Sequence, residues 1–95
     1  SMARFVDHPE HVPCPQCNKL VKRDDVEVNL KLKGGTLNIT EVPQYECECG
    51  FMFIPSETES LINDLQNDKR LEISKNAKID YHTILNRGKK ALKRK

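Results

Sequence analysis

The sequence contains no Trp, and aromatic residues make up only 5% of its 95 residues. It has no run of about 18 apolar residues, so we expect no transmembrane helix. The apolar stretch of a secretory signal peptide is also missing near the N-terminus. We therefore expect a cytoplasmic protein that does not act at a membrane. In such a reducing compartment, paired cysteines bind metals or carry out redox chemistry more often than they form structural disulfides.

Apolar residues are also few. Hydrophobic residues make up 37% of the sequence and charged residues 32%. A chain of this length and polarity buries only a modest core, and small domains often add a metal or disulfides to stabilise it. The four cysteines of the sequence are the candidates for that role.

The cysteines form two close pairs. Cys14 and Cys17 are separated by two residues, and Cys47 and Cys49 by one. Thiolates are soft ligands that suit zinc, and four of them fill its tetrahedral shell, whereas catalytic zinc keeps one position open. We therefore predict that these four residues bind one structural Zn²⁺ per chain.

Three other interpretations of the cysteines stay open. The first pair has the spacing of an oxidoreductase motif, although Pro13 precedes it and no helical pattern follows. Four reduced cysteines without a metal are the second. Because Cys-x-Cys is the less usual pair, replacement of one cysteine ligand by His8 or His11 is the third.

A β-hairpin is predicted between the cysteine pairs. Residues 26–33 alternate apolar and polar side chains, which is typical of a strand with one buried face. Gly34-Gly35 then predicts a two-residue turn. This turn would pair the following residues: Lys33 with Thr36, Leu32 with Leu37, and Leu30 with Ile39.

The flanking segments are shorter. Residues 3–13 show no periodicity and are expected to be irregular. Pro43 is expected to break the second strand or to lie at its edge. Residues 44–49 are predicted to be extended, which would point Cys47 and Cys49 to the same side. Phe51 and Phe53 are expected to pack beneath the metal site.

Two helices are predicted after the cysteines. Ser56 and Glu59 form a capping box with Ser56 as N-cap, and an apolar stripe predicts a helix over residues 57–70. A second helix is predicted over 77–92. We therefore expect an α+β fold, a small zinc-ribbon-like antiparallel hairpin or sheet with a following helix and a basic C-terminal helix or tail. Residues 3–74 would form the zinc-binding domain and 75–95 an appended segment.

The C-terminal segment is strongly basic. From Lys78 onward there are seven basic residues and one acidic residue. Contacts of such a tail with nucleic-acid phosphates would be independent of sequence and sensitive to salt. The candidate residues for these contacts are Arg87, Lys89, Lys90, Lys93, Arg94 and Lys95. The alternative function is therefore that of a zinc ribbon protein that binds nucleic acid through its basic C-terminal tail.

The order of these motifs resembles a known family. The matching parts are Cys14-Pro15-Gln16-Cys17, the hairpin over 26–40, the segment 42–47, Cys49-Gly50 and the helix start at 56–59. Together they are similar to the YgiT-type zinc-finger domain, the N-terminal half of MqsA-like antitoxins. The resemblance covers a little over half of the chain. Members of that family have Cys-x2-Cys at the second pair, where this sequence has Cys-x-Cys.

The resemblance implies a zinc-bound module that binds and neutralises a toxin protein. The helix-turn-helix half of two-domain antitoxins is expected to be missing, because residues 71–95 are too few for it. The sequence offers no nucleophile–base pair and no phosphate-binding loop. We therefore expect a non-enzymatic protein-interaction module with a toxin-like or regulatory partner. A homodimer through an exposed hairpin edge or an exchanged helix is a further possibility.

Overall fold

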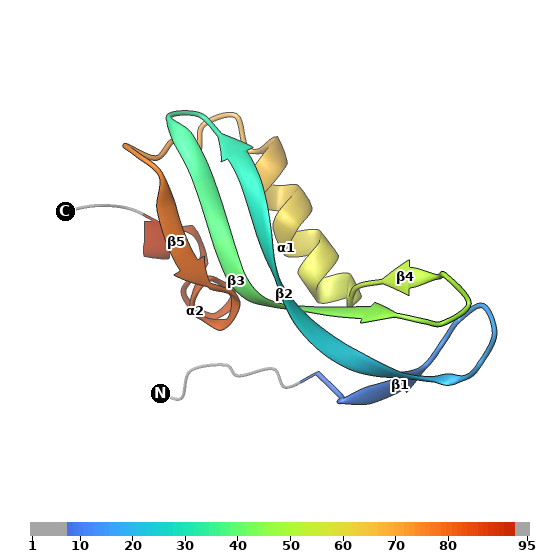
Figure 1. Ribbon diagram of the computed structural model, residues 1–95. Helices are drawn as coiled ribbons and strands as arrows, with labels where there is room; N and C mark the ends of the chain where they lie inside the picture. Colours follow the sequence, from blue (N-terminus) through green and yellow to red (C-terminus); the bar gives the residue numbers. More distant parts are fainter. Residues whose placement is uncertain (1–7, 93–95) are drawn as a thin grey trace.

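The computed structural model describes residues 8–92 of the chain. Figure 1 shows a curled sheet with helices on one side. The elements are β1 (His11–Pro13), β2 (Leu20–Leu32), β3 (Gly35–Glu46), β4 (Met52–Phe53), α1 (Ser56–Asn67), β5 (Ala77–Asp80), α2 (Tyr81–Arg87) and the 3-10 helix η1 (Gly88–Leu92). The predicted α+β class is confirmed. None of the helices within residues 8–92 combines the length and the hydrophobicity that crossing a membrane requires.

A long hairpin of β2 and β3 forms the spine of the sheet. β1 pairs with β2, and β4 pairs with the end of β3 next to the second cysteine pair, all antiparallel. β5 pairs with the other half of β3 and is parallel to it. The prediction that residues 3–13 are irregular is wrong for residues 11–13, which form β1. These residues are extended because their backbone groups form hydrogen bonds with the edge of β2.

The register of the hairpin differs from the predicted one. The observed partners are Leu32 with Gly35, Lys31 with Thr36, Leu30 with Leu37 and Val28 with Ile39. The turn is therefore formed by Lys33 and Gly34, and the predicted turn and pairs are wrong. Gly34 has a φ of 94°, and a Cβ on it would lie 1.8 Å from the carbonyl oxygen of Ile73. This close approach requires glycine inside the turn, a requirement that the strand pattern alone does not reveal.

A β-bulge interrupts the spine near its middle. Val28 pairs with Ile39 but Val26 pairs with Val42, and Glu41 on the bulged strand has a φ of 61°. An extra residue of this kind bends a strand and increases its twist. In Figure 1 the hairpin accordingly curves away from α1 toward β1 and β4.

The bend separates two lobes. We call residues 11–25 and 43–53 the cysteine lobe, and residues 26–42 and 56–92 the helix lobe. Pro43 pairs with Asp25 on one side. On its other side no strand among residues 8–92 pairs with it, since β5 ends opposite Thr40 and β4 pairs with Tyr45 and Glu46. The prediction that Pro43 lies at an edge is confirmed.

The helix lobe holds the larger core. Its fully or nearly buried members come from β2, β3, α1, α2 and the segment between α1 and β5: Leu30, Leu37, Ile39, Val42, Leu65, Leu71, Ile73, Tyr81 and Ile84. α1 ends three residues earlier than predicted. Its N-cap is Pro55, and Ser56 makes no capping hydrogen bond, so the predicted capping box is wrong. The extended backbone of Pro55 starts the helix, and its carbonyl accepts from the Glu59 N–H at 3.0 Å.

The segment after α1 completes this core. The helix predicted over 77–92 is wrong for residues 77–80, which form β5, because the free edge of β3 supplies partners that outweigh a weak helical pattern. Asp80 caps α2 by accepting from the His82 N–H at 2.8 Å. The Tyr81 and Thr58 hydroxyls form a buried hydrogen bond of 2.7 Å. Buried residues of α2 therefore pack in the same core as those of β2, β3 and α1.

Candidate metal centre

The first cysteine pair lies in the turn between β1 and β2. The Cys14 N–H donates to the Lys19 carbonyl and the Asn18 N–H to the Cys14 carbonyl, both at 2.8 Å. Asn18 has a φ of 67°, a left-handed conformation that asparagine tolerates better than most residues. The turn thus brings both thiols to the end of the β1–β2 hairpin.

The second pair lies in a similar turn between β3 and β4, shorter by one residue. The Cys47 N–H donates to the Phe51 carbonyl and the Gly50 N–H to the Cys47 carbonyl, both at 2.8 Å. Gly50 has a φ of 95° and follows the second cysteine, as Asn18 does in the first turn. The predicted extended segment 44–49 is therefore wrong beyond Glu46, where β3 ends. A tight turn brings the Cys47 and Cys49 thiols to the same place.

The two turns place four thiols together. All four sulfur atoms lie within 4.8 Å of one another. The Cys14 and Cys49 sulfurs are 3.8 Å apart, and those of Cys17 and Cys47 are 3.5 Å apart. A tetrahedral zinc with Zn–S bonds of about 2.3 Å separates its sulfurs by about 3.8 Å. All four cysteines are free thiols, so this cluster can hold a metal ion.

Hydrogen-bond donors surround the sulfurs. The Gln16 backbone N–H donates to the Cys14 sulfur at 3.3 Å, and the Gln16 side-chain amide donates to the Cys49 sulfur at 3.4 Å. Cys14 and Cys47 are buried, whereas Cys17 and Cys49 are exposed. Sequence reasoning missed the contact of Gln16, because its position inside the first pair does not reveal that its side chain reaches the second. Such outer contacts orient metal ligands and tune them.

The electrostatics of the cluster favour a bound cation. Burial opposes ionisation of Cys14, but the backbone N–H groups of Cys17 and Gln16 and the neighbouring thiols together lower its pKa to about 7. The Cys49 N–H favours the Cys47 thiolate, yet burial and the other three thiols raise the Cys47 pKa to about 12. One thiolate therefore forms readily and makes ionisation of its neighbour harder. A divalent cation removes this conflict, since it attracts all four thiolates.

A small apolar core supports the cluster. Val21 and Tyr45 are buried beside Cys14 and Cys47, and Val12 packs against them. Phe51 and Phe53 pack there too, and the rings of Tyr45 and Phe53 stack with centroids 5.1 Å apart. The expectation that Phe51 and Phe53 lie beneath the site is confirmed.

Neither histidine near the first pair belongs to the cluster. Within residues 8–92, the group of potential metal ligands consists of the four cysteines. The His8 ring contacts the Tyr81 ring at a centroid distance of 6.3 Å, on the helix-lobe side. His11 pairs with Lys22 in the sheet. A histidine ligand in place of a cysteine is therefore not supported by the geometry.

Of the predicted tail residues, those that the structure describes lie in the helix lobe, apart from the cysteines. Arg87 ends α2 and is exposed, as is Lys90. The Lys89 ammonium is bound to Asp68 at 2.6 Å and to Asp64 at 3.1 Å, both on the C-terminal side of α1. This contact raises the pKa of Lys89 and lowers that of Asp68. Lys93, Arg94 and Lys95 lie outside the described residues.

The fold and site define a class: a small α+β protein with a four-cysteine cluster that can hold a metal. No family model, no curated protein and no solved structure matches the chain. The resemblance to the YgiT-type domain therefore stays a prediction.

Proposed function

We propose that this protein is a non-enzymatic zinc protein that acts as an antitoxin-like protein-interaction module in the cytoplasm. The observation that carries the proposal is the set of four free thiols whose sulfur atoms lie within 4.8 Å of one another, with two of the separations at 3.8 and 3.5 Å. The residues that would hold the ion are Cys14, Cys17, Cys47 and Cys49, with one Zn²⁺ per chain. The bound ion would supply the positive charge that the four thiolates require.

A structural role for this zinc follows from the donor set. Four thiolates complete the tetrahedral shell and leave no position for water or substrate. The two turns belong to different hairpins, β1–β2 and β3–β4, so the ion would tie their ends together. The core beneath them is small, and two of its four buried residues are cysteines. The metal would therefore replace apolar burial as the source of stability in this lobe.

The protein-interaction role is supported by the resemblance and by the surface. Leu20 and Met52 are the large apolar side chains that residues 8–92 leave most exposed, at 71% and 55%. Val21 and Tyr45 point into the core, so their neighbours along the strands, Leu20 and Glu46, point outward. Met52 pairs with Glu46 and shares its face. Leu20 on β2 and Met52 on β4 are thus exposed apolar side chains that a protein partner could cover.

Metal analysis of the purified protein tests the zinc site. We expect about one zinc per chain, and cobalt substitution should give the absorption bands of a tetrahedral thiolate site. Protein that contains no metal and carries a disulfide between Cys14 and Cys17 would overturn this part of the proposal. For the interaction, a pull-down from the native host with zinc-loaded protein should recover one protein in stoichiometric amount. Recovery of nucleic acid alone would favour the alternative function.

A further inference from the structure

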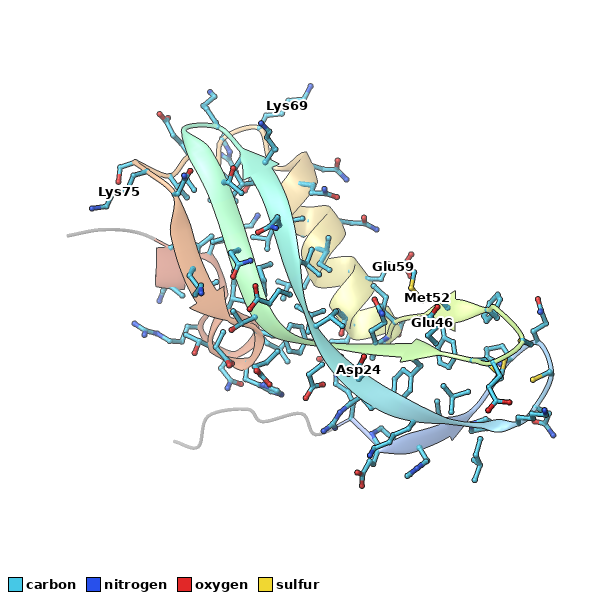
Figure 2. The ribbon with its side chains drawn as sticks, viewed as in Figure 1. Asp24, Glu46, Met52, Glu59, Lys69 and Lys75 are labelled. Carbon is cyan, nitrogen blue, oxygen red and sulfur yellow. The ribbon has the colours of Figure 1, made fainter. Side chains whose placement is uncertain are left out.

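Basic residues from three separate segments gather at the far end of the helix lobe. Lys31 and Lys33 adjoin the β2–β3 turn, Lys69 and Arg70 follow α1, and Lys75 precedes β5. Backbone contacts hold these segments together, because the Ile73 N–H donates to the Lys33 carbonyl at 2.9 Å. In Figure 2, Lys69 and Lys75 lie at this end, whereas Asp24, Glu46 and Glu59 lie farther down the molecule. We call these five basic residues the basic end.

A hollow of about 330 Å³ opens among three of these lysines, Lys31, Lys33 and Lys69. Apolar side chains of Leu32, Leu65 and Leu71 line it as well. Asp68 also borders the hollow, but its carboxylate is bound to Lys89 at 2.6 Å. The hollow therefore combines an apolar lining with a rim of net positive charge.

The three lysines of the rim have no salt-bridge partner within residues 8–92. Other basic residues are paired: Lys19 with Glu48 at 3.8 Å, and Lys89 with two aspartates. Acidic residues predominate elsewhere in the described chain, in both strands of the spine and in the first turn of α1: Asp24, Asp25, Glu27, Glu41, Glu46, Glu57 and Glu59. The basic end, where Glu72 is also exposed, carries a net positive charge and would attract a negatively charged partner more strongly than the rest of the described surface does.

We propose that the basic end binds an acidic segment of a protein partner, with an apolar side chain of that segment seated in the hollow. Its carboxylates would face Lys31, Lys33 and Lys69, and its apolar side chain would lie against Leu32 and the exposed edge of Leu71, above the buried Leu65. This inference rests on the proposed function as a protein-interaction module, and it specifies the chemical character of the partner segment that binds.

The lining of the hollow favours a peptide over a nucleic acid. Binding of single-stranded nucleic acid uses aromatic side chains on which bases stack. No aromatic side chain lines this hollow, and the aromatic residues of the cysteine lobe lie at the other end of the spine. A phosphate backbone has no apolar group to bury against the leucine lining. An acidic peptide with an apolar residue would contact both the lysine rim and the leucine lining.

Peptide binding to the zinc-loaded full chain tests the inference. The probes are a labelled peptide in which leucines alternate with glutamates, the same peptide with serines for leucines, and a single-stranded oligonucleotide. Fluorescence anisotropy gives the affinities at about 50 and 200 mM salt. We expect the leucine–glutamate peptide to bind most tightly, more weakly at the higher salt, and to shift amide signals of residues around the hollow in NMR spectra.

Charge reversal locates the binding surface. The variant Lys31→Glu/Lys33→Glu/Lys69→Glu should bind the leucine–glutamate peptide at least about tenfold more weakly, because three attractive charges become repulsive. The control Lys22→Glu/Lys78→Glu/Arg87→Glu changes the net charge equally at exposed residues away from the hollow and should bind within about threefold of wild type. Circular dichroism and zinc content check that both variants fold.

Three outcomes would overturn the inference: equal losses in the two variants, equal affinity for the serine and leucine peptides, or tighter binding of the oligonucleotide. Each of them leaves the proposed function standing if the chain still binds zinc and recovers a protein partner. Conversely, absence of zinc would refute the metal site without bearing on the basic end. The failures of the two proposals are therefore distinguishable.

Discussion

The cysteine lobe and the helix lobe share the two strands of one hairpin, but different interactions stabilise them. The helix lobe buries apolar side chains from five segments in a single core. Within the described residues, the cysteine lobe buries Val21, Pro43 and Tyr45 besides two cysteines, and three half-buried apolar residues pack around its core. The stabilisation of a core is roughly proportional to the apolar area that it removes from water. The hydrophobic effect therefore stabilises the cysteine lobe much less than the helix lobe.

This difference teaches that a continuous strand pair does not imply uniform stability. Local opening occurs where few apolar contacts hold the backbone. In this protein the bulge at Glu41 lies at the boundary, and beyond it the proposed metal would be the main source of stability.

Loss of the metal should show most clearly that the two lobes are stabilised by different interactions. Cys47→Ser removes a buried ligand, and binding of a structural zinc contributes on the order of 10 kcal/mol. We expect amides of residues 11–25 and 43–53 to lose hydrogen-exchange protection, while amides of β5 and α1 keep theirs. Hydrogen exchange with mass spectrometry measures this. An unchanged melting temperature, or equal loss in both lobes, would refute the comparison.

Shortening a core side chain of the helix lobe should lower the stability of the protein without changing metal binding. Leu37 is fully buried, and Leu37→Ala should lower the free energy of unfolding by about 2–5 kcal/mol because it leaves a cavity. Urea denaturation of the zinc-loaded protein measures the change, and zinc stoichiometry should stay at one. Leu20→Ala is the control, with an expected change below about 0.5 kcal/mol because Leu20 is exposed. Similar costs for both would argue against the core described above.

Two tyrosines offer a matched comparison between the lobes. Tyr81→Phe removes the buried hydrogen bond to Thr58 and should cost about 1–2 kcal/mol, because the Thr58 hydroxyl is left unpaired. Tyr45→Phe removes a bond of 2.5 Å to the Pro9 carbonyl, and Pro9 is exposed, so water can replace the donor. Denaturant unfolding of both variants should therefore show the larger loss for Tyr81→Phe. A larger loss of stability in Tyr45→Phe would contradict the conclusion that the Tyr81–Thr58 hydrogen bond is the better buried of the two.

A smaller effect is expected at the edge of the metal site. Gln16→Ala removes the amide donor to the Cys49 sulfur, and loss of such outer contacts weakens metal binding by about 10–100-fold. Because this contact is exposed, we expect a loss of about tenfold, measured by competition with a chromophoric chelator. Gln66→Ala on α1 is the control and should leave zinc affinity unchanged. An unchanged affinity in Gln16→Ala would show that the contact does not support the ligand.

The smallest effect should come from the ion pair between η1 and α1. The contact with Asp68 raises the Lys89 pKa, so its contribution to stability is complete below the ordinary lysine pKa and is lost as the pH rises through the raised value. The difference in unfolding free energy between wild type and Lys89→Met should therefore be present at pH 7. It should disappear at strongly alkaline pH. A difference that persists there would mean that packing of the lysine stem, and not its charge, stabilises the contact.

Local patterns in the sequence determined several features correctly. The alternation over residues 26–33 marks a real strand, the apolar stripe after Pro55 marks α1, and the cysteine spacing marks the four residues that the structure brings together. Each of these signals depends on neighbours a few positions apart. Strand and helix periodicity act over that range, so the sequence alone contains the information.

Contacts between segments far apart in the chain determine the remaining features. The hairpin register depends on Ile73 approaching Gly34, and β5 depends on a free edge of β3. The contact of Gln16 with Cys49 and the gathering of Lys31, Lys33 and Lys69 likewise join segments far apart in the chain. Periodicity carries no information about which distant segments meet, because those contacts follow from how the whole core packs. The sequence thus determined which residues can bind the metal, and the fold decided what surrounds them.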